Sequence, residues 1–104
     1  MYNPIIITTL CDKYEIAERI QNILLEKRLI AGCQISKRKS KYWWNDKIEE
    51  TTEFHIEMRS KENLFEEIKD IIQNIHDYEV CEISYCEIKG ANKEFLDWIE
   101  KETI

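Results

Sequence analysis

The sequence predicts an α+β domain with the ferredoxin-like βαββαβ order of elements, a long central hairpin and a C-terminal helix. Three observations support this fold class. Four segments have the composition or the two-residue alternation of strands, and three others carry apolar residues at helical spacing. The two middle strand segments are long and separated only by a short turn. Finally, the 104 residues include only two glycines and one proline, so we expect a single domain over residues 1–104 without linkers.

The boundaries follow from local signals. Residues 4–10 form an apolar run rich in isoleucine and threonine, typical of a buried strand. Asp12 and Ser60 stand where helix-capping side chains are expected, and Asn92 does the same for the last helix. The predicted order is strand 4–10, a helix from Asp12 to near Arg28, strand 31–44, turn 45–47, a return strand to Arg59, a helix from Ser60 to His76, strand 79–89 and a short helix after Asn92.

Composition and charge exclude several classes of protein. The net charge of −6 makes the chain a poor general binder of nucleic acid or anionic membrane. No stretch approaches the ~18 apolar residues of a membrane span, and the start of the chain lacks the basic region of a signal peptide. We therefore expect a cytoplasmic location. The four cysteines contain no Cys-x-x-Cys pair, which favours reduced structural thiols over a zinc site or a redox pair.

The tract from Lys37 to Trp44 has the most unusual composition, with cations beside aromatic rings. Such a tract can bind single-stranded nucleic acid by phosphate attraction and base stacking. However, the facing strand around Phe54 presents carboxylates where an RNA-recognition domain has stacking aromatics. We favour the alternative in which the lysines keep an exposed arm from unwanted pairing and the rings bury against a neighbouring subunit.

Two histidines are candidates for metal or acid–base chemistry. His55 alternates with Glu53 and Glu57 on one strand face, which a solvated polar face explains better than a metal site. His76 closes a helix before acidic residues, so it is either a capping residue or a ligand. Acyl transfer by a Cys–His pair would need Cys33 or Cys81 close to His76. No catalytic motif is visible.

Several motifs, in register along almost the whole chain, resemble those of the CutA family of divalent-cation tolerance proteins. The segment 26–33 is similar to the family's Glu-x-Lys/Arg-Leu-Ala-Ala-Cys pattern, and 76–83 is similar to its His-Pro-Tyr-x-x-Pro-Glu-Ile signature. The other matching segments are Thr9-x-x-Asp12, Ser40-x-Tyr42-x-Trp44-x-x-x-Ile48, Arg59-Ser60 and Asn92-x-x-Phe95-Leu96-x-Trp98-Ile99.

The resemblance implies a homotrimer of interlocking hairpins and a non-catalytic role in binding divalent cations, copper among them. It also implies a cleft between subunits and a metal site that uses His76 with Glu82. The cleft candidates carried over from the family are Cys33, Tyr42, Trp44, Arg59, Tyr78 and Trp98. Two other functions stay open, namely a trimeric small-ligand sensor similar to the PII signalling proteins and an enzyme with an inter-subunit site.

The sequence departs from the family pattern in four places. Cys11, Asp77 and Cys81 stand where the family has prolines, and Asp46 stands where it has a turn glycine. Replacing prolines in the loop after the second helix predicts a more mobile loop. The new carboxylate and thiol near His76 are competent metal ligands, which favours a metal site there.

Overall fold

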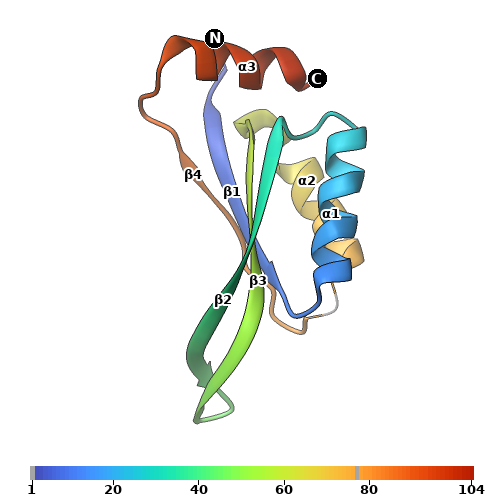
Figure 1. Cartoon of the computed structure of the whole chain (residues 1–104), viewed down its shortest axis with the longest axis vertical. Helices are drawn as coiled ribbons and strands as arrows, with labels where there is room; N and C mark the ends of the chain where they lie inside the picture. The colour runs from blue at the N-terminus through green and yellow to red at the C-terminus, as the bar shows by residue number, and fades with distance from the viewer. Residues whose placement is uncertain (1, 77) are drawn as a thin grey trace.

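A computed structural model describes residues 2–76 and 78–104 and confirms the ferredoxin-like α+β fold, with a four-stranded antiparallel sheet in the order β2-β3-β1-β4. Helices α1 and α2 lie side by side on one face of the sheet, and α3 lies across one end (Figure 1). The elements are β1 (Pro4–Cys11), α1 (Tyr14–Glu26), β2 (Gly32–Trp44), β3 (Lys47–Lys61), a 3-10 turn (Glu62–Leu64), α2 (Phe65–Ile75), β4 (Ile83–Glu87) and α3 (Lys93–Glu102).

The core lies between the sheet and helices α1 and α2. Strand β1 is central in the sheet, with β3 on one side and β4 on the other. Every second residue of β1 from Ile5 to Cys11 is buried, so one face of the strand packs under the helices. The fully buried apolar side chains facing this layer include Ile7, Ile20, Leu24, Ile56, Met58, Ile68 and Ile72.

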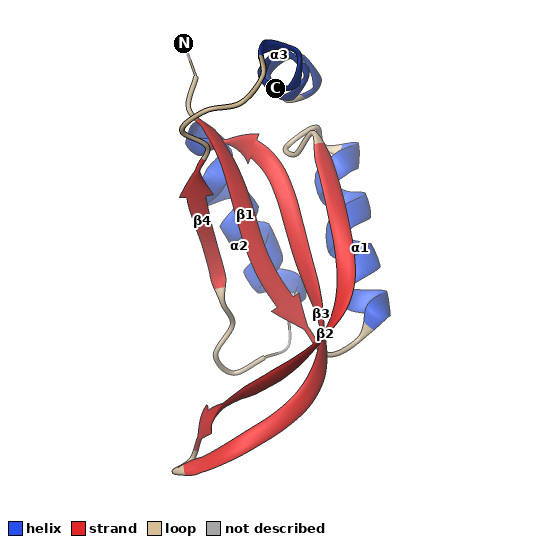
Figure 2. Ribbon diagram, turned by 60° about the vertical axis from the view of Figure 1, so that its left-hand side comes forward, coloured by secondary structure: helices blue, strands red, loops and turns tan. Residues whose placement is uncertain are grey.

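The hairpin of β2 and β3 extends well past the end of the helical layer (Figure 2). Its register runs from Gly32 opposite Arg59 to Trp44 opposite Lys47. Asn45 and Asp46 form the two-residue turn with φ values of 51° and 62°, the left-handed geometry of a type I′ hairpin. The predicted turn is confirmed, and aspartate accepts the position where the family has glycine because its short side chain tolerates this backbone conformation.

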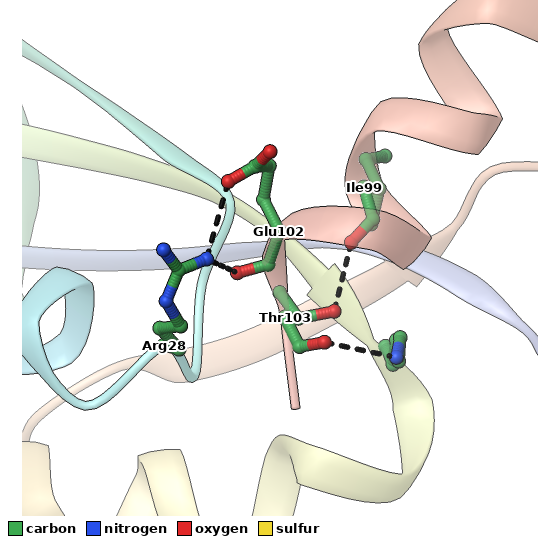
Figure 3. Close-up of polar contacts among 5 residues, drawn as sticks. Arg28, Ile99, Glu102 and Thr103 are labelled. Atoms are coloured by element: carbon green, nitrogen blue, oxygen red, sulfur yellow. Dashed lines mark hydrogen bonds and ion pairs between the residues drawn. The ribbon is translucent and has the colours of Figure 1, made fainter.

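Helix α3 is anchored at the opposite end of the sheet from the hairpin tip. A Cβ built on Gly32 would lie 2.8 Å from Cη2 of Trp98, so the absent side chain of this glycine makes room for the indole. The C-terminal end of α3 is held by Arg28, whose guanidinium donates to the backbone oxygen and to the carboxylate of Glu102 at 3.4 and 3.2 Å (Figure 3). Lys61 donates to the carbonyl of Thr103, which completes the anchor.

The predicted helix caps are corrected. Ser60 does not cap a helix: it is a buried residue of β3, and its hydroxyl donates to the carbonyl oxygen of Leu29. Lys13, not Asp12, precedes α1, and it makes no side-chain capping bond. Asn92 does occupy the N-cap position of α3, but its side chain donates to Glu94 instead of capping the backbone.

The last strand is also shorter than predicted, because it covers only Ile83–Glu87 of the expected 79–89. Residues 78–82 form a loop that closes one wall of a groove beside the hairpin. The expectation for Asp77 lies outside the described residues.

Candidate functional site

A groove of about 790 Å³ lies between the distal half of the hairpin and the loop that leads into β4. One wall is the part of β2 from Ser40 to Trp44, which carries aromatic rings. The other wall comes from loop residues 78–82, and the floor is the end of β1 with the facing part of β3. The lining residues are Leu10, Asp12, Ser40, Lys41, Tyr42, Trp43, Trp44, Thr51, Glu53, Tyr78, Glu79, Val80, Cys81 and Glu82.

A half-buried tyrosine and a buried carboxylate form a hydrogen-bonded pair in this groove. The hydroxyl of Tyr78 donates to Oε2 of Glu53 at 2.7 Å, and only 6% of Glu53 is exposed. Burial, followed by the hydrogen bond to Glu53, raises the pKa of Tyr78 well above its usual range, so the phenol stays protonated and remains a donor. The pair therefore fixes the loop onto the sheet.

Glu53 was expected on a solvated polar face, and that expectation is wrong. It does share the sheet face of His55 and Glu57, as the alternation predicted, but the loop folds over it. No local sequence pattern predicts this contact, since Glu53 and Tyr78 are 25 positions apart in the sequence and all of α2 lies between them. The family resemblance identified Tyr78 but not its partner.

His76 also holds the loop in place, through hydrogen bonds to Tyr78 and to Leu10 of β1. Its Nδ1 accepts a hydrogen bond from the backbone N–H of Tyr78 at 3.1 Å, so the second ring nitrogen, Nε2, donates to the carbonyl oxygen of Leu10. The rings of His76 and Tyr78 also meet edge to face with centroids 4.6 Å apart. Both ring nitrogens thus have partners within the chain, so a metal ion at His76 would have to displace one of these bonds.

The structure places Tyr42 and Trp44, two of the inter-subunit cleft candidates, on the hairpin wall of this groove within one chain. Both share one face of β2, and about 39% of Tyr42 and 37% of Trp44 is exposed. Trp43 is the most exposed of the three, with 71% of its surface open to solvent. Across the hairpin, Lys41 forms an ion pair with Glu50 at 3.7 Å, so acidic residues of β3 partly neutralise the basic tract.

Arg59 and Trp98 lie far from this groove, at the α3 end of the sheet. Arg59 stands opposite Gly32, the residue that contacts Trp98, and its guanidinium donates to Oε1 of Gln34 at 3.1 Å. Trp44 is twelve positions along β2 from Gly32, which corresponds to about 40 Å of strand. One chain therefore does not bring all the predicted cleft residues together.

Cys33 points into the core layer next to this α3 end. Burial raises its pKa to about 11, although the nearby positive charge of Arg59 opposes the shift.

We expect Cys33 to react slowly with iodoacetamide at neutral pH, because only the thiolate is nucleophilic and its fraction is small well below a pKa of about 11. Its alkylation rate should rise about tenfold per pH unit through the mildly alkaline range. Mass spectrometry of peptides sampled over time measures this rate, with the exposed Cys86 as internal reference. A Cys33 rate equal to that of Cys86 at neutral pH would contradict the assignment.

The described residues do not contain three histidine, cysteine, aspartate or glutamate side chains that gather closely enough to hold a metal ion. Glu82 is exposed at the groove and accepts a hydrogen bond from Ser84 at 2.8 Å. Burial raises the pKa of the neighbouring Cys81 thiol, which opposes thiolate formation. A site that uses Glu82 therefore needs further ligands from elsewhere.

Among residues 2–76 and 78–104, no helix is long and apolar enough to cross a membrane.

Comparison with known proteins is consistent with the family motifs found in the sequence. Residues 5–102 match the family described as CutA1 divalent ion tolerance protein. The chain is 41% identical over 101 residues to the divalent-cation tolerance protein CutA of Archaeoglobus fulgidus, which covers 97% of each chain. It is 35% identical over 99 residues to the CutA of Pyrococcus horikoshii, which covers 95% of this chain and 97% of that one.

Solved structures agree. The crystal structure of CutA1 from Ehrlichia chaffeensis superposes with a TM-score of 0.92 at 36% identity, covering 100% of this chain and 98% of that one. CutA from Archaeoglobus fulgidus gives a TM-score of 0.90 at 38% identity, with 98% of each chain covered. Sequence and structure thus agree over nearly the whole length, and the chain belongs to the CutA1 divalent ion tolerance protein family.

Proposed function

We propose that this chain is a non-catalytic, cytoplasmic protein that assembles as a homotrimer and binds divalent cations, with copper the favoured ion. The observation that carries the proposal is the match of residues 5–102 to a family described by divalent ion tolerance. Relatives that match nearly end to end are named for the same tolerance and not for a reaction.

Self-association is supported by the shape and surface of the chain. The hairpin projects with Trp43 and Ile48 exposed by 71% and 57%, and clustered apolar side chains of this kind are typical of surfaces that another subunit covers. The ~40 Å between Trp44 and the Arg59–Trp98 end also means that only a neighbouring chain can complete the predicted cleft. The number of three subunits comes from the family resemblance.

Cation binding is supported by the oxygen donors around the groove, where Glu79 and Glu82 are exposed and Asp12 lies at the floor. Carboxylates suit divalent ions, and copper in addition favours an imidazole. His76 becomes available as a ligand only when it releases Leu10 or Tyr78. The proposed site therefore couples metal binding to movement of the loop.

Calorimetric titration with copper and zinc, together with sedimentation equilibrium, tests the proposal. We expect a trimer at micromolar concentration and copper binding that Glu82→Gln and His76→Ala each weaken at least about tenfold. Glu18→Gln, an exposed carboxylate of α1, is the matched control and should leave binding unchanged. A monomer at micromolar concentration would overturn the assembly, and binding unaffected by His76→Ala would remove His76 from the site.

A second candidate is a small-ligand sensor of PII type. The volume of about 790 Å³ and the aromatic wall favour it, because small-molecule sites typically occupy ~300–1,000 Å³ and are lined by such rings. A panel of metabolites in a thermal-shift assay separates the two functions. A shift with a metabolite but no calorimetric signal with copper or zinc would favour the sensor.

A further inference from the structure

Cys11 ends β1, and Cys81 lies in the loop just before β4, with its Sγ beside Thr9 of β1. The antiparallel ladder of β1 and β4 ends with Thr9 opposite Ile83. Residue 81 lies in the loop beyond this ladder, and the same register continued by two residues along each segment would bring Cys11 opposite Cys81. Directly opposed residues in antiparallel strands have Cα atoms about 4.5–5.5 Å apart, within the ~4.4–6.8 Å that a disulfide spans.

The two side chains also lie toward the same face of the sheet. Cys11 is fully buried on the helix-facing side of β1, two residues after Thr9 on the same face. The Sγ of Cys81 lies 3.7 Å from Oγ1 of Thr9, so it points toward this face too. The Cys11 thiol now donates to the carbonyl oxygen of Lys13 at 3.3 Å, and a rotation about its Cα–Cβ bond would turn the sulfur.

From this placement we propose that Cys11 and Cys81 are a thiol-modification site that forms an internal disulfide by exchange with a small-molecule disulfide. The half-buried Cys81 is the attacking group, since Cys11 is inaccessible to solvent. The Cys81 thiolate attacks one sulfur of the small disulfide, forming a mixed disulfide and releasing one small thiol. The Cys11 thiolate then attacks Sγ of Cys81, so the protein disulfide forms and the second small thiol leaves.

The product would bind the groove loop covalently to the end of β1. In the thiol form, hydrogen bonds of His76 and Tyr78 hold this loop. The disulfide would add a link at Cys81, beside the groove-lining Glu82. Oxidation would thus restrict the loop wall of the groove, whatever ligand the groove takes.

Incubation with oxidised glutathione, followed by mass spectrometry of the intact chain and of its peptides, tests the proposal. Burial raises the pKa of Cys81, so the incubation is run at alkaline pH. We expect the wild-type chain to yield a peptide pair linked through Cys11 and Cys81, with glutathione carried by the exposed Cys86. Cys86→Ser, which removes that exposed thiol of β4, should yield the same linked pair, and its intact mass should fall by two hydrogen atoms.

The two single variants separate the steps. Cys11→Ser should retain glutathione on Cys81, because the thiol that would displace it is gone. Cys81→Ser should carry neither glutathione nor a disulfide at Cys11. The peptide map of the wild-type protein decides the question even if a variant folds poorly. Three results for the wild-type chain would overturn the proposal. Cys81 could keep glutathione without an internal link, or it could form a disulfide with Cys86 or with another chain. Cys81 could also stay unmodified while Cys86 reacts fully.

Discussion

Replacing Ile7 with alanine is expected to lower the free energy of unfolding by about 3 kcal/mol, because it removes buried methyl groups and leaves a cavity in the middle of the core. Ile7 is fully buried on the central strand, opposite Met58 in β3 and Tyr85 in β4. The structure around it has little room to collapse, since strands flank it on both sides and helices cover it. Urea unfolding followed by circular dichroism measures the change.

The control for this substitution is Ile104→Ala, which removes the same atoms from a side chain that is 63% exposed. We expect an effect below about 0.5 kcal/mol there. Both variants and the wild type are compared at one protein concentration, because self-association makes the apparent stability depend on concentration. Equal losses at Ile7 and Ile104 would contradict the position of Ile7 in the core.

Replacing Tyr78 with phenylalanine is expected to lower the free energy of unfolding by about 1–3 kcal/mol, because it leaves the buried carboxylate of Glu53 without its donor. The ring and its contact with His76 remain, so the loss reports the hydroxyl alone. A double-mutant cycle with Glu53→Leu, which removes the acceptor, measures the coupling between the two groups.

The chain offers a matched control, since Tyr85 donates to Oε2 of Glu62 at 2.9 Å in an exposed pair of the same chemistry. Tyr85→Phe should change the stability by less than about 0.5 kcal/mol, because water replaces the lost bond. A coupling energy between Tyr78 and Glu53 near zero would contradict the role of this pair in holding the loop.

The fold was predictable from the sequence because its signals are local. Alternation along the hairpin and the Asn45–Asp46 turn depend only on neighbouring residues, and both are confirmed. Ser60 was wrongly assigned as a helix cap because only its local sequence was considered. A helix does follow it, but its hydroxyl bonds to the carbonyl oxygen of Leu29, which is distant in the sequence, and this bond stabilises Ser60 in the strand.

The candidate site was only partly predictable. The resemblance supplied Tyr42, Trp44 and Tyr78, which the structure places along one groove. Glu53 could not be found, since its burial depends on a loop that returns across the sheet after α2. The engagement of both His76 nitrogens was equally hidden, because one partner is a backbone carbonyl of the first strand.

The projecting hairpin also affects how the mass of this protein is measured. The chain has extents of 45 × 26 × 21 Å and a radius of gyration of 14.4 Å, whereas a compact chain of about 100 residues has a radius near 13 Å. A single elongated chain has a larger frictional coefficient than a sphere of equal mass, so it leaves a gel-filtration column early and imitates a larger particle. Subunit number is therefore best taken from methods that do not depend on shape, such as light scattering or sedimentation equilibrium.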